Sequence, residues 1–189
     1  QFINPKSMDR LCIVKVAEAE RPYERAFFLA SSGAEYAKKS TALVAQKRIT
    51  KQALAAAVIE EFVVGTPVNF NFFYSPIHNR LELLGTDTRR QTNLEGFLRI
   101  PAMYQGDVLD HVALSYEEAG HITVTVLESM LEQAFAMGEA FVAASKRFHP
   151  RGIIGPFALQ SVITAGPPKK DIVVIDVSPR MPGSPGIAA

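Results

Sequence analysis

A chain of 189 residues is long enough to bury one sizeable hydrophobic core or two smaller ones. Hydrophobic residues make up 48% and charged residues 21%, as in an ordinary globular protein, and a net charge of +1 argues against a nucleic-acid partner, which needs a broad basic surface. No apolar run approaches the length that crosses a bilayer, so we expect no membrane partner.

The only cysteine, Cys12, lies in the apolar run LCIVKV. We interpret it as a small buried hydrophobic residue rather than a nucleophile. A single cysteine allows no internal disulfide, which fits a reducing, cytoplasmic setting. The chain starts without an initiator methionine and stops soon after a candidate site, so we expect it to be part of a longer protein.

The first third of the chain predicts both strands and helices. A buried strand is predicted over Leu11–Ala17, with Lys15 as its one charged residue. Lys15 is either a cation for phosphate oxygens or a lysine that extends its ammonium group to solvent, and the residues alone favour the second. An Ala- and Lys-rich helix follows over Gly33–Arg48, and Thr50 is a reasonable N-cap for a short helix through Ala57.

The next strand, Val58–Val64, ends at Gly65 and contains the adjacent residues Glu60 and Glu61. Neighbouring residues of a strand point to opposite faces, so we expect at least one glutamate to face polar surroundings. The backbone of such a strand can hydrogen-bond an adenine edge while a carboxylate binds a ribose hydroxyl. An edge strand with two exposed glutamates is the more common explanation.

The middle of the chain predicts a hairpin followed by a polar stretch. Val68–Tyr74 alternates between apolar and polar side chains, as in a half-buried antiparallel strand, and Arg80–Gly85 is its expected partner. The polar stretch Thr86–Asn93 is either a solvated connection or a binding segment for a phosphorylated ligand, because arginine suits bidentate phosphate recognition. The side chains available for such binding are Arg89, Arg90, Gln91, Asn93 and Arg99.

The residues that follow predict a loop and then a long helix. Met103–Gly120 is expected to be mostly loop, with a short strand near Val112–Leu114. A helix is predicted over about Val124–Phe148, where apolar residues follow the helical period. His121 would then lie at a helix N-terminus and contact a substrate phosphate or carboxamide, although a histidine that caps backbone groups is the ordinary explanation.

Two apolar runs near the end of the chain carry the strongest site signal. Ile153–Ser161 and Asp171–Arg180 are rich in β-branched residues and bounded by glycine and proline. This pattern predicts two antiparallel strands joined by a loose hairpin. Each strand has one polar oxygen ligand near its end, Gln160 on the first and Asp176 on the second.

A carboxylate such as Asp176 is unusual in an apolar strand. The period of two puts it on the same face as Ile172 and Val174, where an unpaired charge would be costly. A hard cation such as Mg²⁺ binds oxygen ligands of this kind, and Gln160 and Asp176, with Arg180 just beyond, would then form a metal–phosphate site. An Asp176 that turns outward or pairs with Arg180 is the plainer alternative, which the spacing alone slightly favours.

Three segments together resemble a known family. IEEFVVGT, FFYSPIHNRLELLGTDTRRQTNLEGFLRIPA and IIGPFALQ are similar to the archaeal PurP family, the formate-dependent FAICAR synthetases of purine biosynthesis. The resemblance runs from about Leu11 to the end of the chain. It implies an α+β, ATP-grasp fold of antiparallel sheets with flanking helices, in a fragment without the N-terminal pre-ATP-grasp domain. Residues 11–65 would form a small ATP-binding lobe, and residues 66–189 a C-terminal lobe truncated at its end.

The resemblance also implies a reaction and its participants. An ATP-dependent ligase of IMP biosynthesis would join formate to the amine of AICAR through formyl phosphate, with Mg²⁺ or Mn²⁺, in a homo-oligomer. The implied roles are phosphate contact for Lys15; adenine contact for Glu60, Glu61, Phe62 and Val63; nucleotide contact for Gln91; substrate contact for Asn93, Arg99 and His121; metal binding for Gln160 and Asp176; and catalysis for Arg180.

The chain departs from the family pattern at several of these positions. Gln160 brings no negative charge, Asp176 is shorter than the usual glutamate, and His121 replaces an amide. The turn after Lys15 lacks the usual glycines, and the segment SPRMPGSPG lacks a terminal asparagine. Two alternatives therefore stay open: a PurP-like ligase that uses another acid and amine, and a nucleotide-binding paralogue without turnover.

Overall fold

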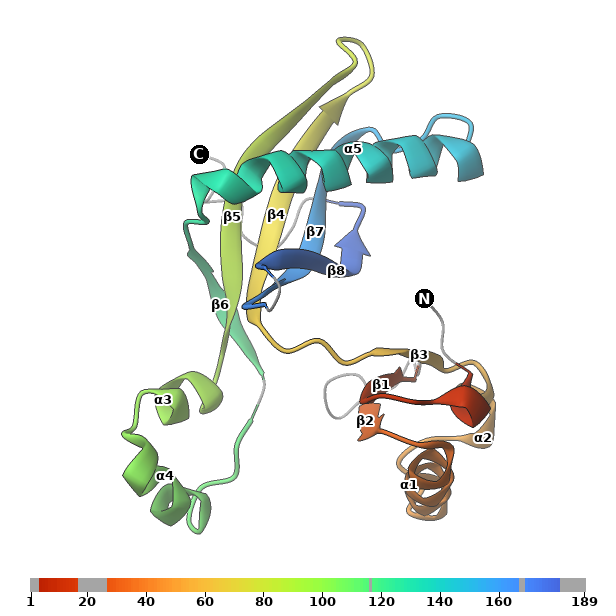
Figure 1. The fold of residues 1–189 in the computed structure, drawn as a ribbon, viewed down its shortest axis with the longest axis vertical. Helices are drawn as coiled ribbons and strands as arrows, with labels where there is room; N and C mark the ends of the chain where they lie inside the picture. Colours follow the sequence, from red (N-terminus) through yellow and green to blue (C-terminus); the bar gives the residue numbers. More distant parts are fainter. Residues whose placement is uncertain (1–3, 17–26, 116, 167–168, 181–189) are drawn as a thin grey trace. The chain divides into compact units, whose positions relative to one another are not determined.

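The computed structural model describes residues 4–16, 27–115, 117–166 and 169–180. The chain divides into two compact units, an N-terminal unit Gln1–Val63 and a C-terminal unit Val64–Ala189. Each unit has its own antiparallel sheet (Figure 1). Each also has its own hydrophobic core.

The N-terminal unit is built on a three-stranded antiparallel sheet with the order β2-β1-β3. Its elements are the 3-10 helix η1 (Pro5–Ser7), β1 (Cys12–Lys15), β2 (Phe27–Ala30), α1 (Gly33–Ala45), α2 (Lys51–Ala55) and β3 (Val58–Glu61).

Local capping explains where the two helices of this unit begin. The Ser32 hydroxyl accepts a hydrogen bond from the Glu35 amide at 3.2 Å, and the Thr50 hydroxyl accepts one from the Ala53 amide at 3.0 Å. The predicted N-cap at Thr50 is thus confirmed. Cys12 is completely buried in the core of the unit, and burial raises the pKa of its thiol, as expected for a structural cysteine.

The C-terminal unit is built on a five-stranded antiparallel sheet with the order β6-β5-β4-β7-β8. Figure 1 shows α5 lying across one face of this sheet. The elements are β4 (Thr66–Ser75), β5 (Arg80–Gln91), α3 (Leu94–Leu98), α4 (Ala102–Leu109), β6 (Glu118–Thr123), the 3-10 helix η2 (Glu128–Met130), α5 (Leu131–Phe148), β7 (Gly155–Thr164) and β8 (Asp171–Ser178).

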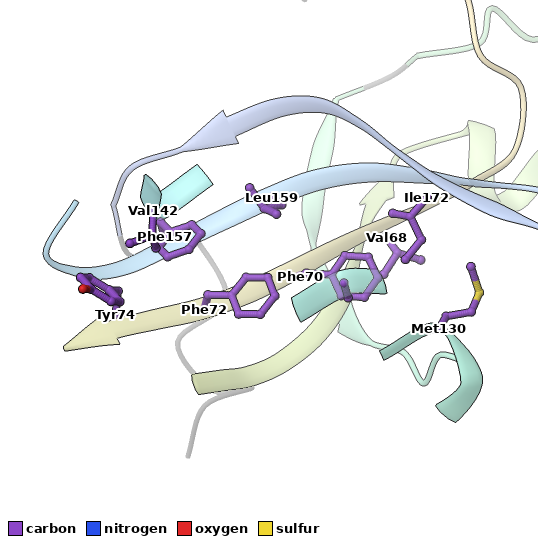
Figure 2. Close-up of a cluster of buried hydrophobic side chains, with 10 residues drawn as sticks. Val68, Phe70, Phe72, Tyr74, Met130, Val142, Phe157, Leu159 and Ile172 are labelled. Atoms are coloured by element: carbon purple, nitrogen blue, oxygen red, sulfur yellow. The ribbon is translucent and has the colours of Figure 1, made fainter. Parts of the chain in front are cut away.

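The core of the C-terminal unit lies between the sheet and α5. The alternation predicted for Val68–Tyr74 is confirmed, because Phe70 and Phe72 of β4 are completely buried on the α5 side (Figure 2). Phe72 stacks on Phe157 of β7 with ring centroids 5.5 Å apart. Burying each large apolar side chain of this kind contributes about 1.5–3 kcal/mol, so this face anchors the sheet.

Three stretches of the C-terminal unit fold differently from their predicted forms. β5 continues through the polar stretch to Gln91, where a solvated connection was one of two expectations. Residues 102–109 form α4, and residues 112–114 are not a strand. The predicted long helix begins only at Leu131, and His121 lies in the strand β6 rather than at a helix N-terminus. Ile122 and Thr123 are β-branched, which favours the strand.

Within the described residues, no helix is both long enough and apolar enough to span a membrane.

Candidate functional site

The face of the five-stranded sheet that points away from α5 carries polar side chains, and we call it the polar face. Strand register brings polar residues of all five strands into line there. One row of directly opposed residues crosses the whole sheet from β6 to β8. Its members are Thr123, Asp87, Asn69, Gln160 and Asp176.

Asp87 of β5 is the most deeply buried member of this row, with no exposed surface. Asn69 Nδ2 donates to Asp87 Oδ1 at 2.8 Å, and Asn71 Nδ2 donates to Asp87 Oδ2 at 2.6 Å. His121 Nδ1 lies 2.5 Å from Asp87 Oδ1. Three side chains from β4 and β6, the strands on either side of β5, therefore surround one carboxylate, as a buried charge requires.

The electrostatics of Asp87 follow from these contacts. Burial, the largest single influence, raises the pKa of Asp87. The three hydrogen bonds and the charge of His121 together outweigh burial, so the pKa of Asp87 is lowered from its ordinary value. Asp87 is thus held as a carboxylate that can only accept hydrogen bonds.

Asn71 has its orientation fixed by Asp87. Because a carboxylate accepts but does not donate, the amide must turn its Nδ2 toward Asp87 and its Oδ1 away from it. Asn71 is 4% exposed, and its Oδ1 has no hydrogen-bond partner among the described residues. A buried acceptor without a partner is unusual in a folded protein and is often found at a functional site.

His121 joins Asp87 to a second carboxylate. Its Nε2 lies 2.8 Å from Glu118 Oε1, and Glu118 Oε2 lies 3.3 Å from Arg89 Nε. Each ring nitrogen of His121 thus faces a carboxylate oxygen, and the ring donates to both only when both nitrogens carry a proton. Acidic and basic side chains therefore alternate in the order Asp87, His121, Glu118, Arg89.

A β-bulge brings Glu118 to this cluster. Residues three apart in a regular strand point to opposite faces, yet Glu118 and His121 point to the same one. The register shift opposite Arg90 and Gln91 leaves Ala119 as an extra residue in β6 and restores Glu118 to the polar face. Gly120, with a φ of +127°, adopts the backbone conformation that glycine tolerates best.

Gln160 and Asp176 lie directly opposite each other on β7 and β8. Gln160 Nε2 donates to Ser178 Oγ at 3.0 Å, while Asp176 Oδ1 accepts from the Val177 amide at 2.9 Å. The predicted pairing of these two strands is confirmed. Directly opposed side chains have Cβ atoms about 4.5–5.5 Å apart, so one amide and one carboxylate share a small area of the polar face.

Asp176 does not share a face with Ile172 and Val174, and the sequence-based expectation was wrong on this point. A register shift between Gln160 and Ser161 leaves Ile175 as an extra residue in β8. The bulge reverses the alternation, so that Ile172 packs in the core while Asp176 points to the opposite face.

The two clusters on the polar face are distinct sites. Asp87 and Asp176 stand three strands apart in one row, a separation of roughly 14 Å at about 4.8 Å per strand. One ion cannot contact both. Consistently, no group of three or more His, Cys, Asp or Glu side chains in the described part of the chain is arranged to hold a metal ion.

The other site residues predicted for the C-terminal unit lie near strand ends. Gln91 ends β5 opposite Glu118. Asn93 has a positive φ of 58°, and its Nδ2 donates to the Ala113 carbonyl at 3.3 Å. Arg99 is exposed after α3, and Arg180 is exposed two residues beyond β8. The segment after residue 180 that departs from the family pattern lies outside the described residues.

In the N-terminal unit the predicted nucleotide contacts lie on β1 and β3. Lys15 Nζ lies 2.7 Å from Glu60 Oε2 in a partly buried ion pair. Glu61 is exposed, 3.6 Å from Arg10, and the Phe62 amide donates to the Leu11 carbonyl at 2.9 Å. The turn after Lys15, residues 17–26, lies outside the described residues.

The sequence-based prediction did not identify four residues of the polar face as site residues: Asn69, Asn71, Asp87 and Glu118. Asn69 and Asn71 were visible as the polar side of an alternating strand, and two amides in succession are a signal that was available. Asp87 and Glu118 carried no such signal, since their contacts depend on the pairing of β5 with residues far along the chain.

Comparison with protein families places most of the chain in one group. A family model described as "Domain of unknown function (DUF1297)" matches residues 35–189. Relatives named 5-formaminoimidazole-4-carboxamide-1-(beta)-D-ribofuranosyl 5'-monophosphate synthetase match almost the whole chain. The protein from Methanocaldococcus jannaschii is 39% identical over 183 residues, 97% of this chain and 49% of the relative. That from Sulfurisphaera tokodaii is 38% identical over 181 residues, 96% of this chain and 50% of the relative.

A solved structure matches as well. The IMP biosynthesis protein PurP from Thermococcus kodakaraensis superposes with a TM-score of 0.59 at 25% identity, over 98% of this chain and 49% of that chain. The predicted fold, α+β with antiparallel sheets of the ATP-grasp type, is confirmed. The chain spans about half the length of these relatives.

Proposed function

The chain belongs to the family described as a domain of unknown function (DUF1297), and on that premise we propose that it is part of an ATP-dependent ligase of purine biosynthesis. The proposed reaction joins formate to the amine of AICAR and yields FAICAR, ADP and phosphate. The main support is the 39% identity over 97% of the chain to a protein named as a synthetase of that product.

The polar face supports this proposal because it combines two kinds of group that the reaction needs. Oxygen ligands lie at the β7–β8 end, and the cations Arg89 and His121 lie at the β5–β6 end. Phosphoryl transfer depends mainly on positioning and on neutralising charge, so separated groups on a rigid sheet suit it. Substrates that span the two clusters would connect them.

The pair Gln160 and Asp176 fits a sparse Mg²⁺ site. Mg²⁺ is usually bound by one or two carboxylates together with substrate phosphates and waters, and not by a full protein cage. One carboxylate and one amide on directly opposed residues match that donor set. The ion would neutralise phosphate charge there, and Mn²⁺ has the same preference for oxygen ligands.

The remaining roles follow the resemblance. Lys15 would contact phosphate oxygens, and the backbone of residues 60–63 would contact the adenine edge, with Gln91 near the nucleotide. Asn93, Arg99 and His121 would contact the second substrate, and Arg180 would contact the transferred group. Formate would first take the terminal phosphoryl group of ATP to give formyl phosphate, and the AICAR amine would then displace phosphate from it.

Two alternatives rest on the substituted ligands. Gln160 lowers the negative charge of the metal site, and Asp176 reaches less far than a glutamate. These features would also suit a ligase with another acid and amine, or a nucleotide-binding protein without turnover. A cytoplasmic location and a homo-oligomeric assembly stay predictions in all three cases.

One measurement separates these possibilities. ADP release by the purified full-length protein should require formate, AICAR and Mg²⁺ together. Release that depends on a different acid or amine would support a ligase with other substrates. Tight ATP binding without any ADP release would reject catalysis and support a nucleotide-binding protein without turnover.

A further inference from the structure

A position on the polar face that suits a small oxyanion is filled by a side chain of the chain itself. The Glu118 carboxylate places one oxygen 2.8 Å from His121 Nε2 and the other 3.3 Å from Arg89 Nε. The two cationic side chains come from directly opposed residues of β5 and β6. Arg89 and His121, on neighbouring strands, thus contact the two oxygens that are bonded to one carboxylate carbon.

The histidine in this arrangement is better fixed than the glutamate. The His121 side chain is 8% exposed and is anchored on its other nitrogen by Asp87. Glu118 is the first residue of the edge strand β6, and its side chain is 44% exposed. Rotation of the Glu118 side chain would break no strand pairing, whereas movement of His121 would disrupt a buried network.

We propose that Glu118 is an internal placeholder and that the phosphate group of a nucleotide substrate displaces it from His121 and Arg89. This inference rests on the proposed function, because a ligase acting on a ribonucleotide must hold a phosphate monoester. A phosphate also presents two oxygens on one central atom, and arginine together with imidazolium binds such groups through charge-assisted hydrogen bonds.

The choice of phosphate over formate follows from charge. Glu118 is a tethered carboxylate, so its effective concentration at the site far exceeds that of any free carboxylate of the same charge. Formate would therefore compete poorly with it. A phosphate monoester carries more negative charge than a carboxylate, and its attraction to two cations is correspondingly larger.

The test compares two charge-matched variants of the full-length protein. Inorganic phosphate is titrated without ATP or formate, and the ring signals of His121 are followed by NMR. Glu118→Gln should tighten phosphate binding roughly three- to tenfold, since a competing charged contact is lost. Glu82→Gln is the control, because Glu82 is also about half exposed and also pairs with an arginine, Arg80 at 3.0 Å.

Three results would overturn the proposal. One is an unchanged or weaker phosphate affinity in Glu118→Gln, and another is an equal gain in Glu82→Gln, which would reflect net charge alone. The third is a gain for formate without one for phosphate. In Arg89→Ala, phosphate should no longer shift the His121 signals. The assay needs no turnover, so a protein that fails as a ligase can still show this binding site.

Discussion

Gln160 and Asp176 face each other across β7 and β8 because a one-residue bulge at Ile175 turns the carboxylate out of the core. Without the bulge, Asp176 would point toward α5 and the apolar side chains there. With it, the carboxylate lies on the polar face beside an amide. The bulge thus moves the Asp176 carboxylate from the apolar core, where its burial would be unfavourable, to a position beside another polar side chain.

We predict that Asp176→Ala lowers the rate of ADP release at least about a hundredfold, while the protein stays folded. The reason is that the variant removes the only carboxylate of the proposed metal site, so phosphate charge would no longer be neutralised. Steady-state ADP release and circular dichroism at the same concentration would check both parts.

The matched control for this variant is Asp171→Ala at the other end of β8. Asp171 accepts a hydrogen bond from Gln133 and is exposed, so its loss should lower stability slightly and leave turnover intact. Full activity in Asp176→Ala would reject the metal role. Equal losses in the two variants would attribute the effect to the strand and not to the carboxylate.

Much of the fold was predictable because its signals are local. The alternation in Val68–Tyr74 reports one buried face directly, and Thr50 marks a helix start through a hydrogen bond three residues away. His121 was misassigned because the stretch before α5 combines β-branched residues with helix-forming ones. Its strand form depends on pairing with Arg89, which is distant in sequence.

The candidate site was less predictable than the fold. A bulge leaves no clear trace in the sequence, so a period of two gave Asp176 the wrong face even though its partner Gln160 was identified. Asp87 was hidden in a stretch interpreted as either connection or binding segment. Its role became visible only when register brought Asn69 and His121 to it.

Lys15→Ala should raise the apparent KM for ATP about three- to tenfold and change stability by less than about 1 kcal/mol. The Lys15–Glu60 ion pair is partly exposed, and such pairs contribute little to folding, whereas a lysine near phosphates contributes to binding. The measurement is ADP release as a function of ATP concentration. Lys38→Ala, an exposed lysine of α1, serves as the control. An unchanged KM in Lys15→Ala would leave Lys15 with a structural role only.

Gly65→Ala should destabilise the C-terminal unit by about 1–3 kcal/mol through a backbone clash. A Cβ at Gly65 would lie 2.3 Å from the Ile163 carbonyl oxygen of β7, which cannot move without disturbing the sheet. Gly106→Ala in α4 is the opposite case, since a Cβ there meets nothing within 4 Å. It should be neutral or stabilise by up to about 1 kcal/mol. Urea unfolding of both variants tests this, and equal midpoints would contradict the prediction.

Asp87→Asn should destabilise the C-terminal unit by about 1–3 kcal/mol at neutral pH. It should also make the stability of this unit depend less on pH in the acid range. Asp87 has a lowered pKa in the fold, so it stabilises the native state above its unfolded pKa of about 3.9. That contribution is lost as pH falls through the lower, folded pKa. Urea midpoints between pH 7 and pH 3 should therefore converge for the wild type and the variant at acid pH. Asp110 is exposed after α4, so the urea midpoints of Asp110→Asn should follow those of the wild type at every pH. If the midpoints of Asp87→Asn also follow the wild type, the buried network does not depend on the charge of Asp87.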